Sequence, residues 1–383
     1  MLLIVLSFSG CRPTPETDDL PDLPIGSDLQ LAIEHVHNSN PTDPPLGISA
    51  AVIAPGYKPW IGAAGYSHPG APISTEWLFN VGSVEKMFQA AVVVQLADEG
   101  RIGLDDHIST YLGDLPNVDG QATIRQLLNH TSGVFNVFEH PDFPWVGEGV
   151  DYTKRWELQE VCANFLLEPY GDPGQVQHYS STNYLLLTEI VEKVTGSTVP
   201  EEIRTRFLAP LDLDNTTVSM VDGPPARFSV AHGWVDLNGD GELDELGDIS
   251  YRWITSLTHP VLFTTAEDLA RWTHALFQEQ SVLDQKQVAE MLSVPELTQY
   301  DPAGGLYGLG IVDYSNVLGR DAIGHAGSSL GYSAAALYLP DEGVTVVWMI
   351  NTGESPTALA ESMMWDAWSA LISVIDEGQT RVR

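Results

Sequence analysis

The order of strand-like and helix-like segments constrains the fold of this chain more than any other feature. Apolar runs at residues 47–54 and 60–65 are joined by Pro and Gly residues, a pattern typical of an antiparallel hairpin. Further strand-like runs lie far along the chain, at residues 307–313, 332–339 and 344–351. We therefore expect an α+β fold in which one antiparallel sheet is built from both chain ends.

The segments between these strands favour helices. Their apolar residues recur at helical spacing, and several segments begin after Thr or end at Gly, which favour helix starts and stops. We expect these helices to cover the sheet and to form an inserted lobe, with a site in the cleft between the two parts. The predicted helices cover residues 86–100, 123–130, 182–195, 265–278 and about 356–376.

A Ser-x-x-Lys motif precedes the first of these helices, at Ser83 and Lys86. Residues three apart share a helix face, so the Lys86 amine is expected beside the Ser83 hydroxyl. A lysine in a dry site can lose its proton and act as a general base, and a helix N-terminus favours a developing oxyanion. The pattern also occurs by chance on surface helices, but here an almost uncharged helix follows it.

Two other segments carry chemically useful side chains. Tyr179 precedes the predicted helix 182–195, and a phenol beside an amine can relay protons. The alternative is a core tyrosine at a helix start. Residues 324–328, Gly-His-Ala-Gly-Ser, lead into a strand pair, where small residues would let a substrate lie along a sheet edge and a backbone N–H complete an oxyanion hole. The alternative is a turn histidine between two strands.

Taken together, these segments resemble the serine β-lactamase-related hydrolases, which include class C β-lactamases, D-Ala-D-Ala carboxypeptidases, D-aminopeptidases and esterases. The resemblance runs from about Gly47 to Asn351 and implies a β-lactamase/transpeptidase-like fold. It is carried by FNVGSVEKMF, IRQLLNHTSG, HYSSTNYLLLTEIVEKVTG, FTTAEDLARW, YGLGI and GHAGSSLGYSAAALYLPDEGVTVVWMIN.

The resemblance implies an acyl-enzyme mechanism that requires no cofactor. Ser83 would be the nucleophile, Lys86 and Tyr179 would share general-base and general-acid duties, and the N–H groups of Ser83 and Ser328 would form the oxyanion hole. His325 stands where the family often has Lys.

Two departures bear on the substrate. Ser181 stands where the tyrosine motif usually has an Asn that holds an acylamide, and Ala326 stands where a Thr often helps to hold a carboxylate. The substrate-binding residues implied are Ser181, His325, Ala326 and Gly327. These departures favour an esterase or small-peptide hydrolase. The alternatives are a β-lactamase or D-Ala-D-Ala carboxypeptidase, a penicillin-binding sensor without turnover, and a calcium-dependent adhesion module, which would leave the Ser/Lys/Tyr set unexplained.

The N-terminal segment indicates export. Residues 1–11 are apolar up to small residues and Cys11, which resembles a lipoprotein signal; a plain secretory signal is the alternative. Residues 12–26 are rich in Pro and Asp and predict a flexible tether to a hydrolase domain over 27–383. We expect a periplasmic or cell-surface protein that meets the membrane only through a lipid anchor. A net charge of -35 argues against nucleic acid as a partner and leaves a small-molecule or peptide substrate.

An acidic loop at residues 236–248 predicts a second site. Its first nine residues match the start of an EF-hand loop, with Gly241 at the sharp turn and Gly247 where a Glu is usual. We expect this loop to bind a structural Ca²⁺; the alternative is a solvated acidic turn. The predicted ligands are Asp236, Asn238, Asp240, Glu242 and Asp244.

Overall fold

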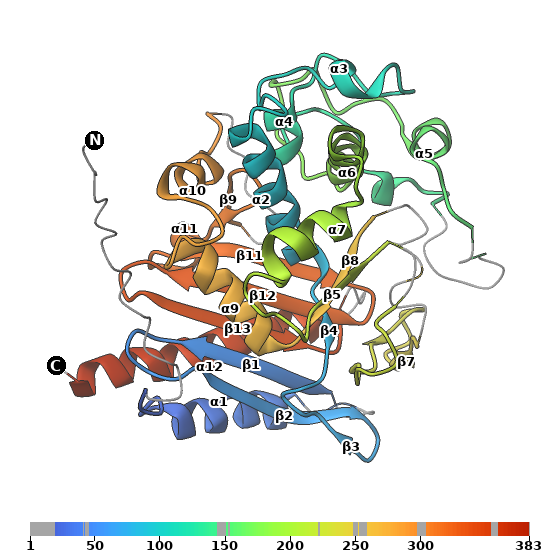
Figure 1. Cartoon of the computed structure of the whole chain (residues 1–383). Helices are drawn as coiled ribbons and strands as arrows, with labels where there is room; N and C mark the ends of the chain where they lie inside the picture. The colour runs from blue at the N-terminus through green and yellow to red at the C-terminus, as the bar shows by residue number, and fades with distance from the viewer. Residues whose placement is uncertain are drawn as a thin grey trace, which may run out of the picture.

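An eight-stranded antiparallel sheet forms the centre of the computed structural model, which describes residues 20–40, 42, 46–143, 151, 154–220, 223–247, 252, 259–296, 304–353 and 359–382 (Figure 1). The strand order is β3-β2-β1-β13-β12-β11-β10-β9, so the first and last parts of the chain meet at the β1–β13 pair. The strands are β1 Gly47–Ile53, β2 Trp60–His68, β3 Ala71–Pro72, β9 Leu306–Tyr307, β10 Val312–Asp313, β11 Ile323–Ser329, β12 Tyr332–Leu339 and β13 Val344–Ile350. This arrangement confirms the predicted sheet from both chain ends.

Both faces of this sheet are covered, and β13 shows why such a strand is apolar along most of its length. Val346 and Trp348 pack in a cluster with helices α1 (Gly26–Ser39) and α12 (Leu359–Val382), whereas Val347 packs on the opposite side with α2 (Glu85–Asp98) and α9 (Ala266–Phe277). Alternate side chains of a strand point to opposite faces, so a strand buried on both sides needs no polar positions. Figure 1 shows α1 and α12 on one side of the sheet.

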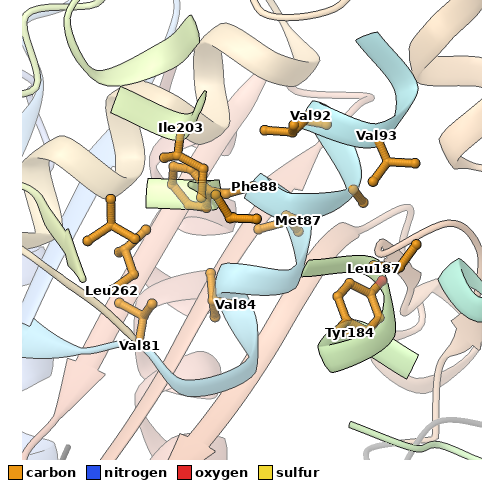
Figure 2. Close-up of a cluster of buried hydrophobic side chains, with 14 of the residues drawn as sticks. Val81, Val84, Met87, Phe88, Val92, Val93, Tyr184, Leu187, Ile203 and Leu262 are labelled. Carbon is orange, nitrogen blue, oxygen red and sulfur yellow. The ribbon is translucent and has the colours of Figure 1, made fainter. Parts of the chain in front are cut away.

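The predicted helical lobe is present on the other side of the sheet. Helix α2 is buried along most of its length, and Figure 2 shows Val84, Met87 and Phe88 among apolar side chains that include Ile203 and Leu262. The remaining helices are α3 Ser109–Leu112, α4 Ile124–Leu128, α5 Leu158–Phe165, α6 Thr182–Thr195, α7 Val199–Ile203, α10 Gln285–Met291 and α11 Ser315–Leu318. Two small sheets complete the fold, with β4 Phe79–Asn80, β8 Val261–Thr264 and β5 Thr217–Ser219 in one and β6 Trp234–Val235 and β7 Asp244–Glu245 in the other.

Local signals in the sequence account for several helix ends. Thr123 caps α4 through a capping box with Gln126, and the Thr265 side chain accepts the N–H of Asp268 at the start of α9. Gly196 ends α6 in the left-handed conformation, with a φ of 74°, that glycine adopts without steric penalty. The positions predicted for these helices are therefore confirmed to within a few residues.

The predicted strand over residues 307–313 is wrong. The segment makes two short strands, β9 and β10, that pair with each other around Gly310. Gly310 has a φ of +71°, and a Cβ there would lie 2.4 Å from the Cβ of Ala90. Gly308 and Gly310 made the sequence over residues 307–313 look like a strand, but glycine at position 310 allows a tight turn against α2.

The C-terminal part of the predicted tether packs on the domain. Leu23 and Ile25 contact the cluster beside α1, and the carbonyl of Pro21 accepts the N–H of Lys58 at 2.9 Å. A flexible tether is thus left as a prediction for residues 12–19, which lie outside the described residues, as does the predicted signal at 1–11. Among the helices in the described ranges, none is long and apolar enough to cross a membrane.

Candidate active site

Ser83 and Lys86 are brought together at the start of α2, as the Ser-x-x-Lys spacing predicts. Ser83 lies in a 3-10 turn, Gly82–Val84, that connects β4 to α2. The Lys86 Nζ donates a hydrogen bond to the Ser83 Oγ at 3.0 Å, and Lys86 is only 3 % exposed. A nucleophile hydroxyl in contact with an amine is the geometry that proton removal by a general base requires.

Tyr179 lies beside this pair. The Lys86 Nζ is 5.3 Å from the centre of the Tyr179 ring, and Tyr179 lines the same cavity as Ser83 and Lys86. Tyr179 lies three residues before Thr182, the first residue of α6, so the start of α6 places it near the start of α2. The structure therefore brings all three predicted catalytic residues to one place.

The buried His130 supports Tyr179, although no sequence pattern predicted a role for it. Its ring lies 4.3 Å from the Tyr179 ring. Its Nδ1 accepts the Ser180 N–H at 3.2 Å and faces the Asn183 amide at 3.1 Å, so the proton of the neutral ring sits on Nε2. Burial, helped by the charge of Lys86, holds the pKa of His130 well below its usual range. His130 belongs to the stretch IRQLLNHTSG, residues 124–133, whose resemblance to the family could have indicated that it lies at the site.

The predicted oxyanion hole depends on a close approach between the Ser83 turn and β11. A Cβ on Gly82 would lie 2.6 Å from the carbonyl oxygen of Ser328, so the two backbones touch at this point. Gly82 also has a φ of +50°, which favours glycine. Ser328 lines the cavity with Ser83. The pairing of the Ser83 and Ser328 N–H groups as an oxyanion hole stays a prediction.

His325 is held inside the fold. It is 2 % exposed, its Nε2 lies 2.8 Å from the hydroxyl of Tyr307, and its Nδ1 bonds the carbonyl of Ala326. Burial, followed by the charge of Lys86, lowers the pKa of His325 to about 3. The ring is therefore neutral at physiological pH and puts no positive charge where related enzymes often have a lysine.

The predicted substrate contacts His325, Ala326 and Gly327 of β11 are not among the residues that line the cavity, and their role stays a prediction. The cavity wall on β11 is formed by Ser328 and Ser329, whereas Ala326 packs in the cluster on the α1 side and Gly327 lies against the Ser83 turn. Ser181, the other predicted contact, does line the cavity.

The cavity has a volume of about 310 Å³. Its wall includes two carboxylates, Glu85 and Glu139, and one buried histidine, His259, besides the predicted residues. Sequence reasoning singled out none of these three, although Glu85 lies inside the Ser-x-x-Lys motif itself. The complete lining is Asn80, Gly82, Ser83, Glu85, Lys86, Asn136, Phe138, Glu139, Tyr179, Ser181, His259, Pro260, Val261, Leu262, Ser328 and Ser329.

The acidic loop forms a compact turn away from this cavity lining. The Asp236 carboxylate accepts the N–H groups of Gly239 and Gly241, at 2.7 and 3.0 Å, and the Asn238 and Asp240 side chains each accept an N–H two residues on. Over the described part of the chain, no three His, Cys, Asp or Glu side chains are grouped to hold a metal ion. Calcium binding stays a prediction.

A family model described as Beta-lactamase matches residues 46–363, which is most of the chain. The chain is 28 % identical over 294 residues to penicillin-binding protein 4* of Bacillus subtilis, an alignment that covers 74 % of this chain and 62 % of that protein. It is 27 % identical over 310 residues to penicillin-binding protein 4 of Amycolatopsis lactamdurans, covering 76 % of this chain and 77 % of the relative.

Solved structures show the same architecture. A D-stereospecific amidohydrolase from Streptomyces sp. superposes with a TM-score of 0.73 at 27 % identity, covering 86 % of this chain and 94 % of that one. The D-amino acid amidase from Ochrobactrum anthropi SV3 superposes with a TM-score of 0.78 at 22 % identity, covering 93 % and 100 % of the two chains. Because the identity is only 22 %, the comparison with the amidase supports the fold alone.

Proposed function

The chain belongs to the beta-lactamase family of serine hydrolases, and we propose that it hydrolyses small ester or amide substrates through an acyl-enzyme on Ser83. The observation that carries this proposal is the 3.0 Å contact between Lys86 Nζ and Ser83 Oγ on the wall of a cavity. A neutral Lys86 amine accepts the hydroxyl proton while Ser83 Oγ attacks the substrate carbonyl carbon. The resulting oxyanion is stabilised by backbone N–H groups, for which Ser83 and Ser328 are the candidates.

Release of the leaving group completes the acylation step. The bond between the carbonyl carbon and the leaving oxygen or nitrogen breaks, and the leaving group takes a proton from the Lys86–Tyr179 pair. Water then attacks the acyl carbon and gives a proton to the same pair. The bond between that carbon and Ser83 Oγ breaks, Oγ takes the proton from the pair, and the carboxylic acid product leaves. The neutral His130 supports the Tyr179 ring in both steps, since it packs against it at 4.3 Å.

Three features support small, weakly charged substrates. The cavity volume of about 310 Å³ is at the lower end of ligand pockets. Ser181 gives the cavity a short hydroxyl in place of an amide, and His325 is buried and neutral, so neither offers the grip on an acylamide or a carboxylate that other members of the family use. The D-stereospecific amidohydrolase among the similar structures supports amides as one substrate class.

A second candidate function is a sensor that is acylated by a β-lactam and stays acylated. The two penicillin-binding proteins among the relatives favour it. The deciding experiment incubates the mature domain with p-nitrophenyl butyrate, D-amino-acid amides and a chromogenic cephalosporin, and follows both product and protein mass. Steady turnover of esters or amides that is lost in Ser83→Ala supports the hydrolase. A stable cephalosporin adduct with no turnover of any substrate would establish the sensor instead.

We also propose that the domain works outside the cytoplasm and is anchored through a lipid on Cys11. The apolar segment before Cys11 and the Pro- and Asp-rich segment after it support this placement. Metabolic labelling with a radioactive fatty acid tests it. The label should appear in the full chain and be absent from Cys11→Ser, whereas equal labelling of both would exclude this anchor.

A further inference from the structure

A buried carboxyl lies between the two residues of the catalytic motif. Glu85 follows Ser83 by two positions and precedes Lys86, and its side chain is 5 % exposed. The Gln89 amide, one helical turn later, donates to both of its oxygens, at 3.3 Å to Oε1 and 3.0 Å to Oε2. Gln89 is itself held by the Thr188 hydroxyl of α6 at 3.3 Å. The carboxyl is therefore fixed in place at the cavity wall.

His259 faces this carboxyl from the segment that leads into β8. Its side chain is 2 % exposed, and its Nε2 lies 3.5 Å from the Glu85 Oε1. Its Nδ1 lies 2.9 Å from the carbonyl oxygen of Pro260, which can only accept, so Nδ1 carries the ring proton. The buried Nε2 is then a lone-pair acceptor, and it has no hydrogen-bond partner within normal distance.

Two acceptors that face each other in a buried site repel, and the His259 Nε2 would be left without a hydrogen-bond donor. An ionised carboxylate opposite the Nε2 lone pair places two negative ends together, and burial penalises the charge as well. A proton on Oε1 removes both the repulsion and the buried charge. The carboxylic acid then donates to Nε2 while Gln89 still donates to Oε2. Buried polar groups are almost always satisfied, which favours this arrangement.

We propose that Glu85 and His259 hold one proton between Oε1 and Nε2, and that this uncharged pair leaves the Lys86 amine free to accept the Ser83 proton. Glu85 and His259 are thus positioning residues for Lys86 that set its charge and do not contact the reacting atoms. The proposal deepens the proposed function, since it rests on Lys86 as the base.

The groups that face Glu85 determine which side chain a negative charge on Glu85 would affect. Lys86 and Gln89 face it from α2, His259 faces it from the segment before β8, and Tyr184 of α6 lies within electrostatic reach. Lys86 is the only cation among them. An ionised Glu85 would therefore hold Lys86 as an ammonium, which cannot accept a proton, whereas a neutral Glu85 exerts no such pull.

The pKa directions agree with this geometry. Burial raises the pKa of Glu85 to about 7, against the opposing effect of Lys86, and burial lowers the pKa of His259 to about 3. The proton of the pair therefore resides on the carboxyl, and the pair becomes anionic as the pH rises through about 7.

Infrared difference spectroscopy tests the pair without catalysis. In a Ser83→Ala background, the protein minus its Glu85→Gln variant should show the carbonyl band of a protonated carboxyl at about pH 5, lost with a midpoint near 7. Added His259→Ala removes the acceptor and admits water, so the midpoint should fall. Absence of the band, or a midpoint that His259→Ala does not move, would overturn the proton sharing.

The pH profile tests the link to Lys86. Gln at position 85 cannot ionise, and it can still donate to His259 and accept from Gln89. The ratio of kcat/KM between Glu85→Gln and the unmodified enzyme should therefore rise by about tenfold as the pH increases through 7. Glu192→Gln, a Glu with a raised pKa outside the cavity lining, is the matched control and should give a constant ratio.

A ratio for Glu85→Gln that does not change with pH would show that the pair does not set the charge of Lys86. An inactive enzyme would instead refute the proposed function, and the infrared measurement would still decide whether Glu85 and His259 share a proton.

Discussion

Gly327 lies so close to the nucleophile turn that a Cβ at this position would be 2.6 Å from the backbone nitrogen of Ser83. The same Cβ would be 2.2 Å from the carbonyl oxygen of Val81. These neighbours are backbone atoms and cannot swing away as a side chain would. The contact between β11 and the turn at Gly82–Val84 thus sets where the Ser83 N–H and hydroxyl point.

Gly327→Ala should therefore reduce kcat strongly, because the added methyl group pushes β11 away from the Ser83 turn. Removing a single oxyanion donor lowers kcat by about 10² to 10³ in serine hydrolases, and we expect a loss of that order. Steady-state kinetics on p-nitrophenyl butyrate measures it, with circular dichroism to confirm folding. Wild-type kcat in a folded Gly327→Ala variant would show that the close approach does not govern the site.

Lys86→Ala should lower acylation by about 10² to 10⁴, because it removes the only amine in contact with the Ser83 hydroxyl among the described contacts. Single-turnover labelling by a fluorophosphonate probe measures this step. Lys193→Ala is the matched control, since Lys193 is exposed and pairs with Glu189 on the surface of α6. Similar labelling rates for both variants would remove Lys86 from the mechanism.

Glu85 should make the unfolding free energy depend on pH. Its pKa is about 7 in the folded protein, against 4.5 for a solvated glutamate, so the folded state binds an extra proton between these values. The contribution is fully present below about pH 4.5 and is lost as the pH rises through about 7, a change of about 3 kcal/mol.

Glu85→Gln removes this dependence. The difference in unfolding free energy between the variant and the unmodified protein should grow in favour of the variant from about pH 4.5 to about 7 and stay level on either side. Urea titrations at each pH measure it, and Glu76→Gln at an exposed position serves as control. A difference that is flat over this range would contradict a buried neutral Glu85.

Calcium should raise the thermal midpoint if the loop over residues 236–244 binds it. A ligand at one hundred times its dissociation constant stabilises the folded state by about 2.7 kcal/mol. Scanning calorimetry in excess Ca²⁺ and in chelator measures the shift, and Asp240→Asn should diminish it. Equal midpoints in the two media would identify the loop as a solvated acidic turn.

Esters should be hydrolysed with a higher kcat/KM than cephalosporins, because Ser181 and Ala326 lack the amide and hydroxyl that hold acylamide and carboxylate groups. Ser181→Asn with Ala326→Thr should narrow this difference. Since Ser181 lines the cavity and Ala326 packs on the α1 side, Ser181→Asn alone should give most of the change. Efficient cephalosporin hydrolysis by the unmodified enzyme, with poor ester turnover, would contradict this account.

Periodicity and spacing were sufficient to predict the sheet built from both chain ends and the contact between Ser83 and Lys86. Mostly apolar runs of strand length lie near both chain ends, as strands covered on both faces require, and they pair as β1 and β13. Ser83 and Lys86 meet because residues three apart share a helix face, which is a local property of the chain. The placement of Tyr179 followed from the family resemblance.

The surroundings of the site were decided by the tertiary structure. Glu85 and His259 lie far apart in sequence, and only the packing of β8 beside α2 brings them to 3.5 Å. Likewise, His325 is neutral because Tyr307 and the fold around it exclude water, which no motif encodes. A sequence specifies which groups can ionise, but burial and neighbours from distant segments decide which of them are charged, because desolvation depends on the complete fold.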